Sequence, residues 1–185
     1  IDECFLDLTL GGGDISMKPF LEEYEGLLLL KAFTKSYGMA GLRLGYCLSA
    51  NQNLLKTMGI QTQPWNVSIP AQAAGIAALG EADFVKAAND LIHTQRPRME
   101  QALQNLGFRV IPSRTNYILF HSAKELREPL LTRGIQIRSC ANYLGLGEGW
   151  YRVAVKLPEE NKRLLEALGE ISGQLTDDRF CEIDN

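Results

Sequence analysis

Lys35 is the residue of this 185-residue chain whose surroundings best suit covalent chemistry. It follows the apolar run "GLLLLKAF" (26–33) and lies in "KAFTKSYGMAGLRLGY" (31–46), with Arg43 eight residues further on. A chain that leaves a buried parallel strand reaches the edge of the sheet where α/β proteins bind ligands. An amine held there can act as a nucleophile, and the guanidinium can bind an anion such as a phosphate. Alone, the pattern also fits a solvated lysine beside a structural arginine.

The elements around this segment change in kind after Gly107. Before it, apolar periodicity and caps predict alternating strands and helices, and after it mainly short strands. The expected strands are 1–8, 26–33, 42–49, 108–113, 115–122, 134–140 and 151–156. The expected helices are 51–60, capped by Asn51, 68–79, capped by Ser68, 82–106, bent at Pro97, 123–133 and 158–174. This order predicts an α/β region with a mostly parallel sheet over 1–95, a smaller α+β domain over 96–175 and a polar tail over 176–185.

Composition narrows the classes of partner. The chain is 45% apolar and 22% charged, with a net charge of −3, which is typical of a soluble domain and offers no general attraction to nucleic acid or to an anionic membrane. Four cysteines without a CxxC pair and two histidines predict no metal site. No stretch approaches the roughly 20 apolar residues of a membrane span. We expect a cytoplasmic protein with reduced thiols, and the start at Ile1 suggests an excerpt from a longer chain.

The segment "TKSYGMAGLRLGY" resembles the Schiff-base segment of fold-type I pyridoxal-phosphate enzymes, in the class I/II aminotransferase family. The resemblance implies pyridoxal 5′-phosphate as cofactor, Lys35 as the Schiff-base lysine and proton carrier, and Arg43 as the phosphate ligand. "DECF" (2–5) is similar to the family's strand-end motif, which implies that Asp2 pairs with the pyridinium nitrogen. Thr34 is a further candidate phosphate ligand.

Two positions depart from the family pattern. Phe5 stands where many members have a tyrosine bonded to the ring hydroxyl, and Ala32 stands where many have a hydroxyl bonded to the phosphate. The resemblance spans roughly residues 1–172 but only the second half of the family's usual polypeptide. It implies a homodimer for the full-length protein, and a fragment that by itself holds the cofactor poorly and is inactive.

Two arginines are the candidates for binding substrate. "GIQIRSCANYLGLGEGWYRVAVKLPEEN" (134–161) resembles the small-domain end of the family. There Arg152 matches the substrate-carboxylate arginine, and Arg138 matches a position that holds a distal phosphate in enzymes with phosphorylated substrates. Asn116 is a third candidate, as a residue lining the site.

Two subgroups of the family fit the chain, and both act on a small phosphorylated amino acid or amine. Threonine-phosphate decarboxylases of cobalamin biosynthesis are similar to it in "DECF", in the threonine before Lys35 and in "IRSCANYLGLGEGWYRVAV" (137–155). Histidinol-phosphate aminotransferases share the "GLRLGY" segment and the arginine pair, and transamination of another amino acid stays open. A non-catalytic transcription regulator that senses the cofactor is the alternative from a different class.

Overall fold

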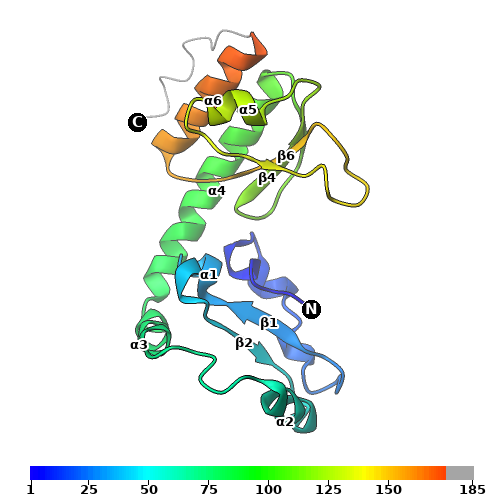
Figure 1. Ribbon diagram of the computed structural model, residues 1–185, viewed down its shortest axis with the longest axis vertical. Coiled ribbons are helices and arrows are strands. Elements are labelled where there is room, and N and C mark those ends of the chain that lie inside the picture. Colours follow the sequence, from blue (N-terminus) through cyan, green and yellow to red (C-terminus); the bar gives the residue numbers. More distant parts are fainter. Residues whose placement is uncertain (174–185) are drawn as a thin grey trace. The chain divides into compact units, whose positions relative to one another are not determined.

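The computed structural model describes residues 1–173, and the chain forms two compact units (Figure 1). The first unit comprises residues 1–90 and the second begins at Leu91, so that helix α4 (Ala82–Asn105) starts in one and ends in the other. The expected polar tail over 176–185 lies outside the described residues. The expected domain limits at residues 95 and 175 remain predictions for the whole protein. No helix in the described part is long and apolar enough to cross a membrane.

The first unit is built around the antiparallel pair of β1 and β2, in which Leu29 faces Leu48 and Ala32 faces Gly45. The segment before β1 contains three short 3-10 helices. The elements of the first unit, in order, are η1 (Leu6–Leu8), η2 (Gly12–Ile15), η3 (Lys18–Phe20), β1 (Leu29–Ala32), α1 (Phe33–Ser36), η4 (Ala40–Leu42), β2 (Gly45–Leu48), α2 (Gln52–Gln61) and α3 (Ile69–Ala78).

The expected strand over 1–8 is wrong. Only Asp2 makes a bridge, parallel to Leu30 of β1, and the chain then turns into η1. The Asp2 carboxylate accepts a hydrogen bond from the backbone N–H of Cys4 at 2.8 Å. Such local bonds compete with a strand ladder, which explains why an apolar-rich segment leaves the sheet after one residue.

The expected parallel sheet is also not formed by the described residues, in which parallel pairing is limited to the Asp2–Leu30 bridge. Residues 33–44 reverse the chain between β1 and β2 through α1 and η4. Gly38 and Arg43 make this reversal with φ angles of +65° and +55°. The tight reversal leaves no room for the crossover helix that a parallel pair requires.

The helices of the first unit confirm the sequence prediction. The side chain of Asn51 accepts the backbone N–H of Leu54, and that of Ser68 accepts the N–H of Ala71, so both expected caps are present. Helix α3 packs its small residues inward. A Cβ atom at Gly75 would lie 2.5 Å from Leu44 Cδ2, so the glycine permits α3 to approach the segment that carries Arg43.

The second unit is a four-stranded antiparallel sheet in the order β3-β4-β6-β5, covered on one face by α4 and α6 (Figure 1). Buried side chains from both helices and from the central strands form its core, including Leu103, Ile118, Phe120, Val153 and Leu168. Its further elements are β3 (Arg109–Ile111), β4 (Tyr117–His121), α5 (Arg127–Leu131), β5 (Arg138–Ser139), β6 (Trp150–Ala154) and α6 (Pro158–Ser172).

The predicted strands and helices of this unit are present but shorter than expected, and α5 and β5 have lost the most residues. Helix α5 begins at Arg127 because the Glu125 carboxylate accepts the backbone N–H of Arg127 at 2.8 Å. Before it, the Ser122 hydroxyl accepts the backbone N–H of Lys124 and donates to the carbonyl oxygen of the same residue. Strand β5 keeps only two residues of the expected 134–140. Helix α4 continues through Pro97 as one element.

Candidate functional site

Lys35 lies in the four-residue helix α1, and its side chain is exposed. Its amine lies 5.1 Å from the centroid of the Phe5 ring, a distance typical of a cation–π contact. No role in the site was expected for Phe5. The contact brings the lysine to the segment that begins with Asp2, and it places an apolar ring beside the Lys35 amine. Thr34, the preceding residue, is half-buried in the same helix.

Asp2 is exposed and next to β1 through its bridge with Leu30. Hydrogen bonds from the thiol and the backbone N–H of Cys4 lower the pKa of Asp2 below its ordinary value, so this carboxylate is anionic at neutral pH. The pKa of the Cys4 thiol is shifted in the opposite direction. Its burial, followed by its hydrogen bond to Asp2 and the charge of that carboxylate, raises the pKa of Cys4 to about 11.

Arg43 follows η4 with a left-handed backbone, which non-glycine residues adopt rarely. Its Nη1 donates to the carbonyl oxygen of Ala40 at 3.2 Å, so one side of the guanidinium is bonded to its own turn. The residue is exposed, and the remaining donors can bind an external anion. Ala32 is the last residue of β1 and offers no hydroxyl to such an anion.

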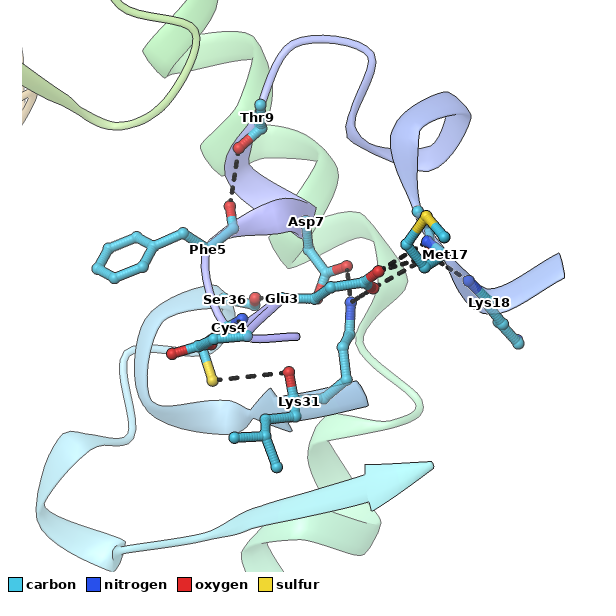
Figure 2. Close-up of polar contacts among 12 residues, drawn as sticks. Glu3, Cys4, Phe5, Asp7, Thr9, Met17, Lys18, Lys31 and Ser36 are labelled. Atoms are coloured by element: carbon cyan, nitrogen blue, oxygen red, sulfur yellow. Dashed lines mark hydrogen bonds and ion pairs between the residues drawn. The ribbon is translucent and has the colours of Figure 1, made fainter. Parts of the chain in front are cut away.

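Sequence reasoning did not predict the charged cluster that Glu3, Asp7 and Lys31 form. Figure 2 shows the Lys31 amine between the carboxylates of Glu3 and Asp7, at 3.9 Å and 2.7 Å. Ser36 also donates to Asp7, at 3.2 Å. The signal was present in "GLLLLKAF", because a lysine within a buried apolar run needs a partner of opposite charge.

The charged cluster borders a cavity of about 850 Å³, whose lining residues all belong to the first unit. Glu3, Asp7 and Lys31 line it together with Tyr37 and Tyr46. The Phe5 ring points away from this cluster (Figure 2). The segment 3–7 therefore has the charged cluster on one side and the lysine–phenylalanine contact on the other.

The second unit brings its two candidate arginines together. Arg138 of β5 lies directly opposite Arg152 of β6, so both side chains project from the same face of the sheet. That face is the one opposite the helices, since the neighbouring residues Tyr151 and Val153 are buried in the core. Two guanidinium groups on one face can together bind a ligand that carries two anionic groups.

An aromatic ring contacts each of these arginines. The Arg152 guanidinium carbon lies 4.8 Å from the Tyr117 ring centroid, and that of Arg138 lies 5.8 Å from the Tyr143 ring centroid. Neither tyrosine was assigned a role from the sequence. Asn116 precedes Tyr117, and its side-chain oxygen accepts the Thr115 hydroxyl at 3.2 Å. Its carbonyl oxygen accepts the backbone N–H of Val155, so this residue also fixes the end of the β4–β6 pair.

The donor set of the first unit fits pyridoxal 5′-phosphate. An amine, a guanidinium and an anionic carboxylate are the complements of an aldehyde, a phosphate and a protonated ring nitrogen. Lys35, Arg43 and Asp2 supply one of each, and all three are exposed rather than occupied by buried ion pairs. The described residues thus contain one complementary group for each of these three parts of the cofactor, and the alanine at position 32 offers no hydroxyl to the phosphate.

The family model "Aminotransferase class I and II" matches residues 1–168. The chain is 36% identical over 175 residues to threonine-phosphate decarboxylase of Salmonella typhimurium, a match that covers 92% of this chain and 48% of the relative. It is 35% identical over 177 residues to a histidinol-phosphate aminotransferase of Anaeromyxobacter sp., covering 94% and 48%. The chain therefore spans about half the length of the curated relatives it matches.

Solved structures agree with this assignment. The histidinol-phosphate aminotransferase of Clostridium acetobutylicum matches with a TM-score of 0.87 and 29% identity, over 94% of this chain and 53% of that one. The enzyme of the same name from Sinorhizobium meliloti, solved in complex with pyridoxal-5′-phosphate, shares the fold with a TM-score of 0.82 at 23% identity, over 93% and 48%. The expected family and its cofactor are confirmed. The chain belongs to the class I and II aminotransferase family.

Proposed function

We propose that the full-length protein is a pyridoxal-phosphate-dependent enzyme that acts on a small phosphorylated amino acid, as a threonine-phosphate decarboxylase of cobalamin biosynthesis does. The observation that carries the proposal is the pair of Arg138 and Arg152, opposite each other on one sheet face. A substrate with a carboxylate and a phosphate presents two anionic groups to two guanidinium groups. The relative from Salmonella typhimurium supports this choice of substrate class.

The residues of the first unit would hold the cofactor. Lys35 would bind its aldehyde covalently, Arg43 with Thr34 nearby would hold its phosphate, and the anionic Asp2 would keep its ring nitrogen protonated. When bound, this cofactor supplies an electron-accepting ring that stabilises the negative charge formed when a bond at the substrate Cα breaks. The released Lys35 amine can then accept a proton from the substrate Cα or return one to it.

The reaction outcome would depend on which bond at the substrate Cα the protein presents to the cofactor for cleavage. The two arginines, with Asn116 beside them, would set this orientation by fixing the carboxylate and the phosphate. Loss of the carboxylate gives decarboxylation, whereas loss of the Cα proton leads to transamination. The sequence similarity of "DECF" and "IRSCANYLGLGEGWYRVAV" to the decarboxylase subgroup favours the first outcome.

An aminotransferase acting on histidinol phosphate is the second candidate. It is supported by the 35% identity to the Anaeromyxobacter protein and by the fold match to the Clostridium acetobutylicum enzyme. Both candidates use the same lysine and the same arginine pair. A cofactor-sensing regulator would keep the lysine but turn over neither substrate.

The deciding experiment uses the full-length protein loaded with pyridoxal phosphate. Release of CO₂ from O-phosphothreonine is measured beside glutamate formation from histidinol phosphate and 2-oxoglutarate, with further amino acids as donors. We expect CO₂ release that Lys35→Ala abolishes and that Lys86→Ala leaves intact, because Lys86 is an exposed lysine in an ion pair on α4. Glutamate formation without CO₂ would establish the aminotransferase instead. Absence of both activities would contradict an enzymatic function on these substrates.

We further propose that the full-length protein works as a homodimer in the cytoplasm. Helix α3 supports an assembled state, because it directs large aliphatic side chains outward: Ile69 is 81% exposed and Ile76 is 75% exposed, while Gly75 is buried. Light scattering of the full-length protein tests the proposal, and a monomeric mass at micromolar concentration would contradict it.

A further inference from the structure

The Asp7 carboxylate contacts one residue on each side of Lys35 in the sequence, Lys31 and Ser36. Its Oδ1 accepts a hydrogen bond from Lys31 Nζ at 2.7 Å, and its Oδ2 accepts one from Ser36 Oγ at 3.2 Å. Lys31 belongs to β1, which leads into α1, and Ser36 is the residue after Lys35. The Asp7 side chain therefore links strand β1, which leads into α1, to the end of the helix that carries Lys35, and Figure 2 shows Asp7 with Lys31 and Ser36.

The Lys31 amine depends on Asp7 because its other partner is already engaged. The buried Glu3 carboxylate accepts the backbone N–H of Met17 at 2.8 Å and the Ser16 hydroxyl at 3.0 Å, and it lies 3.9 Å from Lys31. The Lys31 side chain is only 14% exposed. A cation so poorly hydrated requires a close anion, and Asp7 is the one at hydrogen-bonding distance.

The Asp7 backbone is itself fixed from a third direction. Asn89 Nδ2 in α4 donates to the Asp7 carbonyl oxygen at 2.7 Å. Residue 7 lies in η1, whose own hydrogen bonds span only a few residues. The bond to Asn89 therefore limits the movement of Asp7 toward or away from Lys31 and Ser36.

Helix α1 cannot fix the direction of Lys35 by itself, because four residues form little more than one turn and such a helix is unstable alone. Its position depends on tertiary contacts. Phe33 is buried at its start, and Ser36 is 2% exposed at its end. The bond between Ser36 and Asp7 joins side chains at the residue directly after the lysine, and it fixes the end of the turn that carries Lys35.

We propose that Asp7 is a positioning residue for Lys35, acting through Lys31 and Ser36 without touching the cofactor. The inference rests on the proposed function, since it gives a role to residues behind the lysine that would bind pyridoxal phosphate. It predicts that the placement of Lys35, rather than the affinity for substrate, depends on the Asp7 carboxylate.

The test compares three variants of the full-length protein with the wild type. Asp7→Asn leaves one acceptor oxygen for two donors, and Ser36→Ala removes only the hydroxyl bond. Asp90→Asn is the matched control, because it makes the same chemical change in the exposed Lys86–Asp90 pair, which has the same 2.7 Å distance. Lys31→Arg is the conservative variant, since it keeps the cation and its reach to both carboxylates.

Three readouts are combined: kcat and KM, the induced circular dichroism of the bound cofactor at matched occupancy, and hydrogen exchange of the cofactor-free protein over residues 33–38. For Asp7→Asn we expect kcat to fall about tenfold with KM within about twofold, since a small misplacement of a reacting group is costly. We also expect a weaker dichroic band and exchange about tenfold faster. Ser36→Ala should show about a threefold loss of kcat, while Lys31→Arg and Asp90→Asn stay close to the wild type.

The outcomes separate this inference from the proposed function. If the wild type retains no cofactor at Lys35 after borohydride reduction and mass spectrometry, the proposed function fails, and hydrogen exchange still decides whether Asp7 holds α1. If the wild type is active and Asp7→Asn and Ser36→Ala both match it in kcat, dichroism and exchange, the positioning role is wrong. Should Asp7→Asn fail to fold, Ser36→Ala decides, because an alanine in place of a buried serine preserves the packing.

Discussion

Arg152 and Arg138 share a sheet face but differ in how firmly each is held. Arg152 is half-buried on the central strand β6, 4.8 Å from the Tyr117 ring centroid, whereas Arg138 is exposed on the two-residue edge strand β5. A planar guanidinium against an aromatic ring is already oriented for a carboxylate. The geometry therefore favours Arg152 as the main anchor of the substrate.

We expect Arg152→Lys in the full-length protein to raise KM by about 10-fold or more, because a lysine loses both bidentate bonding and stacking. Arg138→Lys should raise KM by only about threefold, because an exposed ionic contact contributes less. Steady-state kinetics with the substrate identified by the CO₂ and glutamate assays measures both values. A larger effect at Arg138 than at Arg152 would reverse this ranking of the two residues.

Cys4 offers a pH-dependent probe of the Asp2 carboxylate. Burial, together with the hydrogen bond to Asp2 and its charge, disfavours the thiolate and raises the pKa of Cys4 to about 11. Alkylation of Cys4 should therefore stay slow through pH 9, because only the thiolate reacts. Its rate should rise with a midpoint near the pKa of Cys4, at about pH 11.

In Asp2→Asn the negative charge beside the thiol is absent, so the midpoint for Cys4 should move down toward the ordinary thiol range. Iodoacetamide labelling followed by mass spectrometry of the Cys4 peptide gives the rate at each pH. An unchanged midpoint in the variant would show that Asp2 does not act on this thiol. Because Asp2 is also the proposed partner of the ring nitrogen, the same variant should weaken cofactor binding in the full-length protein.

A candidate site residue is easiest to predict from the sequence when it lies within a contiguous motif. Lys35, Arg43 and Asp2 were chosen from contiguous segments, and their placement in one unit is a geometric fact, while their roles stay predictions. The cluster of Glu3, Asp7 and Lys31 joins residues up to 28 positions apart, and neither carboxylate is special within its own segment. Only Lys31, within an apolar run, indicated that an acidic partner is present, and the sequence did not show which acidic residue this is.

At the scale of elements, the segment "GGGD" (11–14) illustrates how a turn can depend on one of several glycines. A Cβ atom at Gly12 would collide with the backbone carbonyl oxygen of Leu6, whereas one at Gly13 would meet no described atom within 4 Å. Because a backbone atom cannot rotate away as a side chain can, Gly12 fixes the close approach of η1 and η2.

Gly12→Ala should destabilise the protein by about 3 kcal/mol, the upper range for overpacking, and Gly13→Ala should change the free energy of unfolding by less than about 0.5 kcal/mol. Urea denaturation of the two variants beside the wild type measures the difference. Equal effects at both positions would mean that Leu6 moves aside and that the approach is not tight. Since η1 carries Asp7, Gly12→Ala should also accelerate hydrogen exchange over residues 33–38.

Helices and strands were predicted well where a capping residue or a strong hydrophobic periodicity defines their limits. The helices begun by Asn51 and Ser68, and helix α6 with Pro158 at its first position, are present within one or two residues of the expected limits. The prediction of a strand over 1–8 was wrong because it relied on apolar content alone. It did not account for the competing hydrogen bond from the Cys4 N–H to the Asp2 carboxylate. A parallel sheet was expected from apolar runs alone, but pairing direction is decided by the connection, here the reversal through residues 33–44.

At the scale of the whole molecule, the proposed chemistry is divided between the two units. The candidate cofactor residues lie within 1–90, and Arg138, Arg152 and Asn116 lie beyond Leu91. Neither unit contains both sets, so the proposed activity would need residues from both units. Each set was therefore proposed from a separate sequence motif, "TKSYGMAGLRLGY" with "DECF" for the first unit and "GIQIRSCANYLGLGEGWYRVAVKLPEEN" for the second.

The last prediction concerns the 185-residue chain taken alone. Lys35, Arg43 and Asp2 are all exposed, so water competes for each of their contacts with a cofactor, and exposed ionic contacts contribute only about 0.2–1 kcal/mol apiece. The relatives are about twice as long as the matched segment, which leaves room for further cofactor ligands in the full-length protein. We therefore expect the 185-residue chain to bind pyridoxal phosphate at least about 100-fold more weakly than the full-length protein.

Absorbance titration of the two proteins measures this ratio, and Lys35→Ala in the short chain shows how much of its signal comes from other lysines. Tight stoichiometric binding by residues 1–185, abolished by Lys35→Ala, would contradict the prediction and show that the exposed set is sufficient. Weak binding that Lys35→Ala does not change would mean that the cofactor residues act only when the remaining ligands and the exclusion of water are supplied by the rest of the protein. The comparison thus measures how far the affinity of the site depends on its burial.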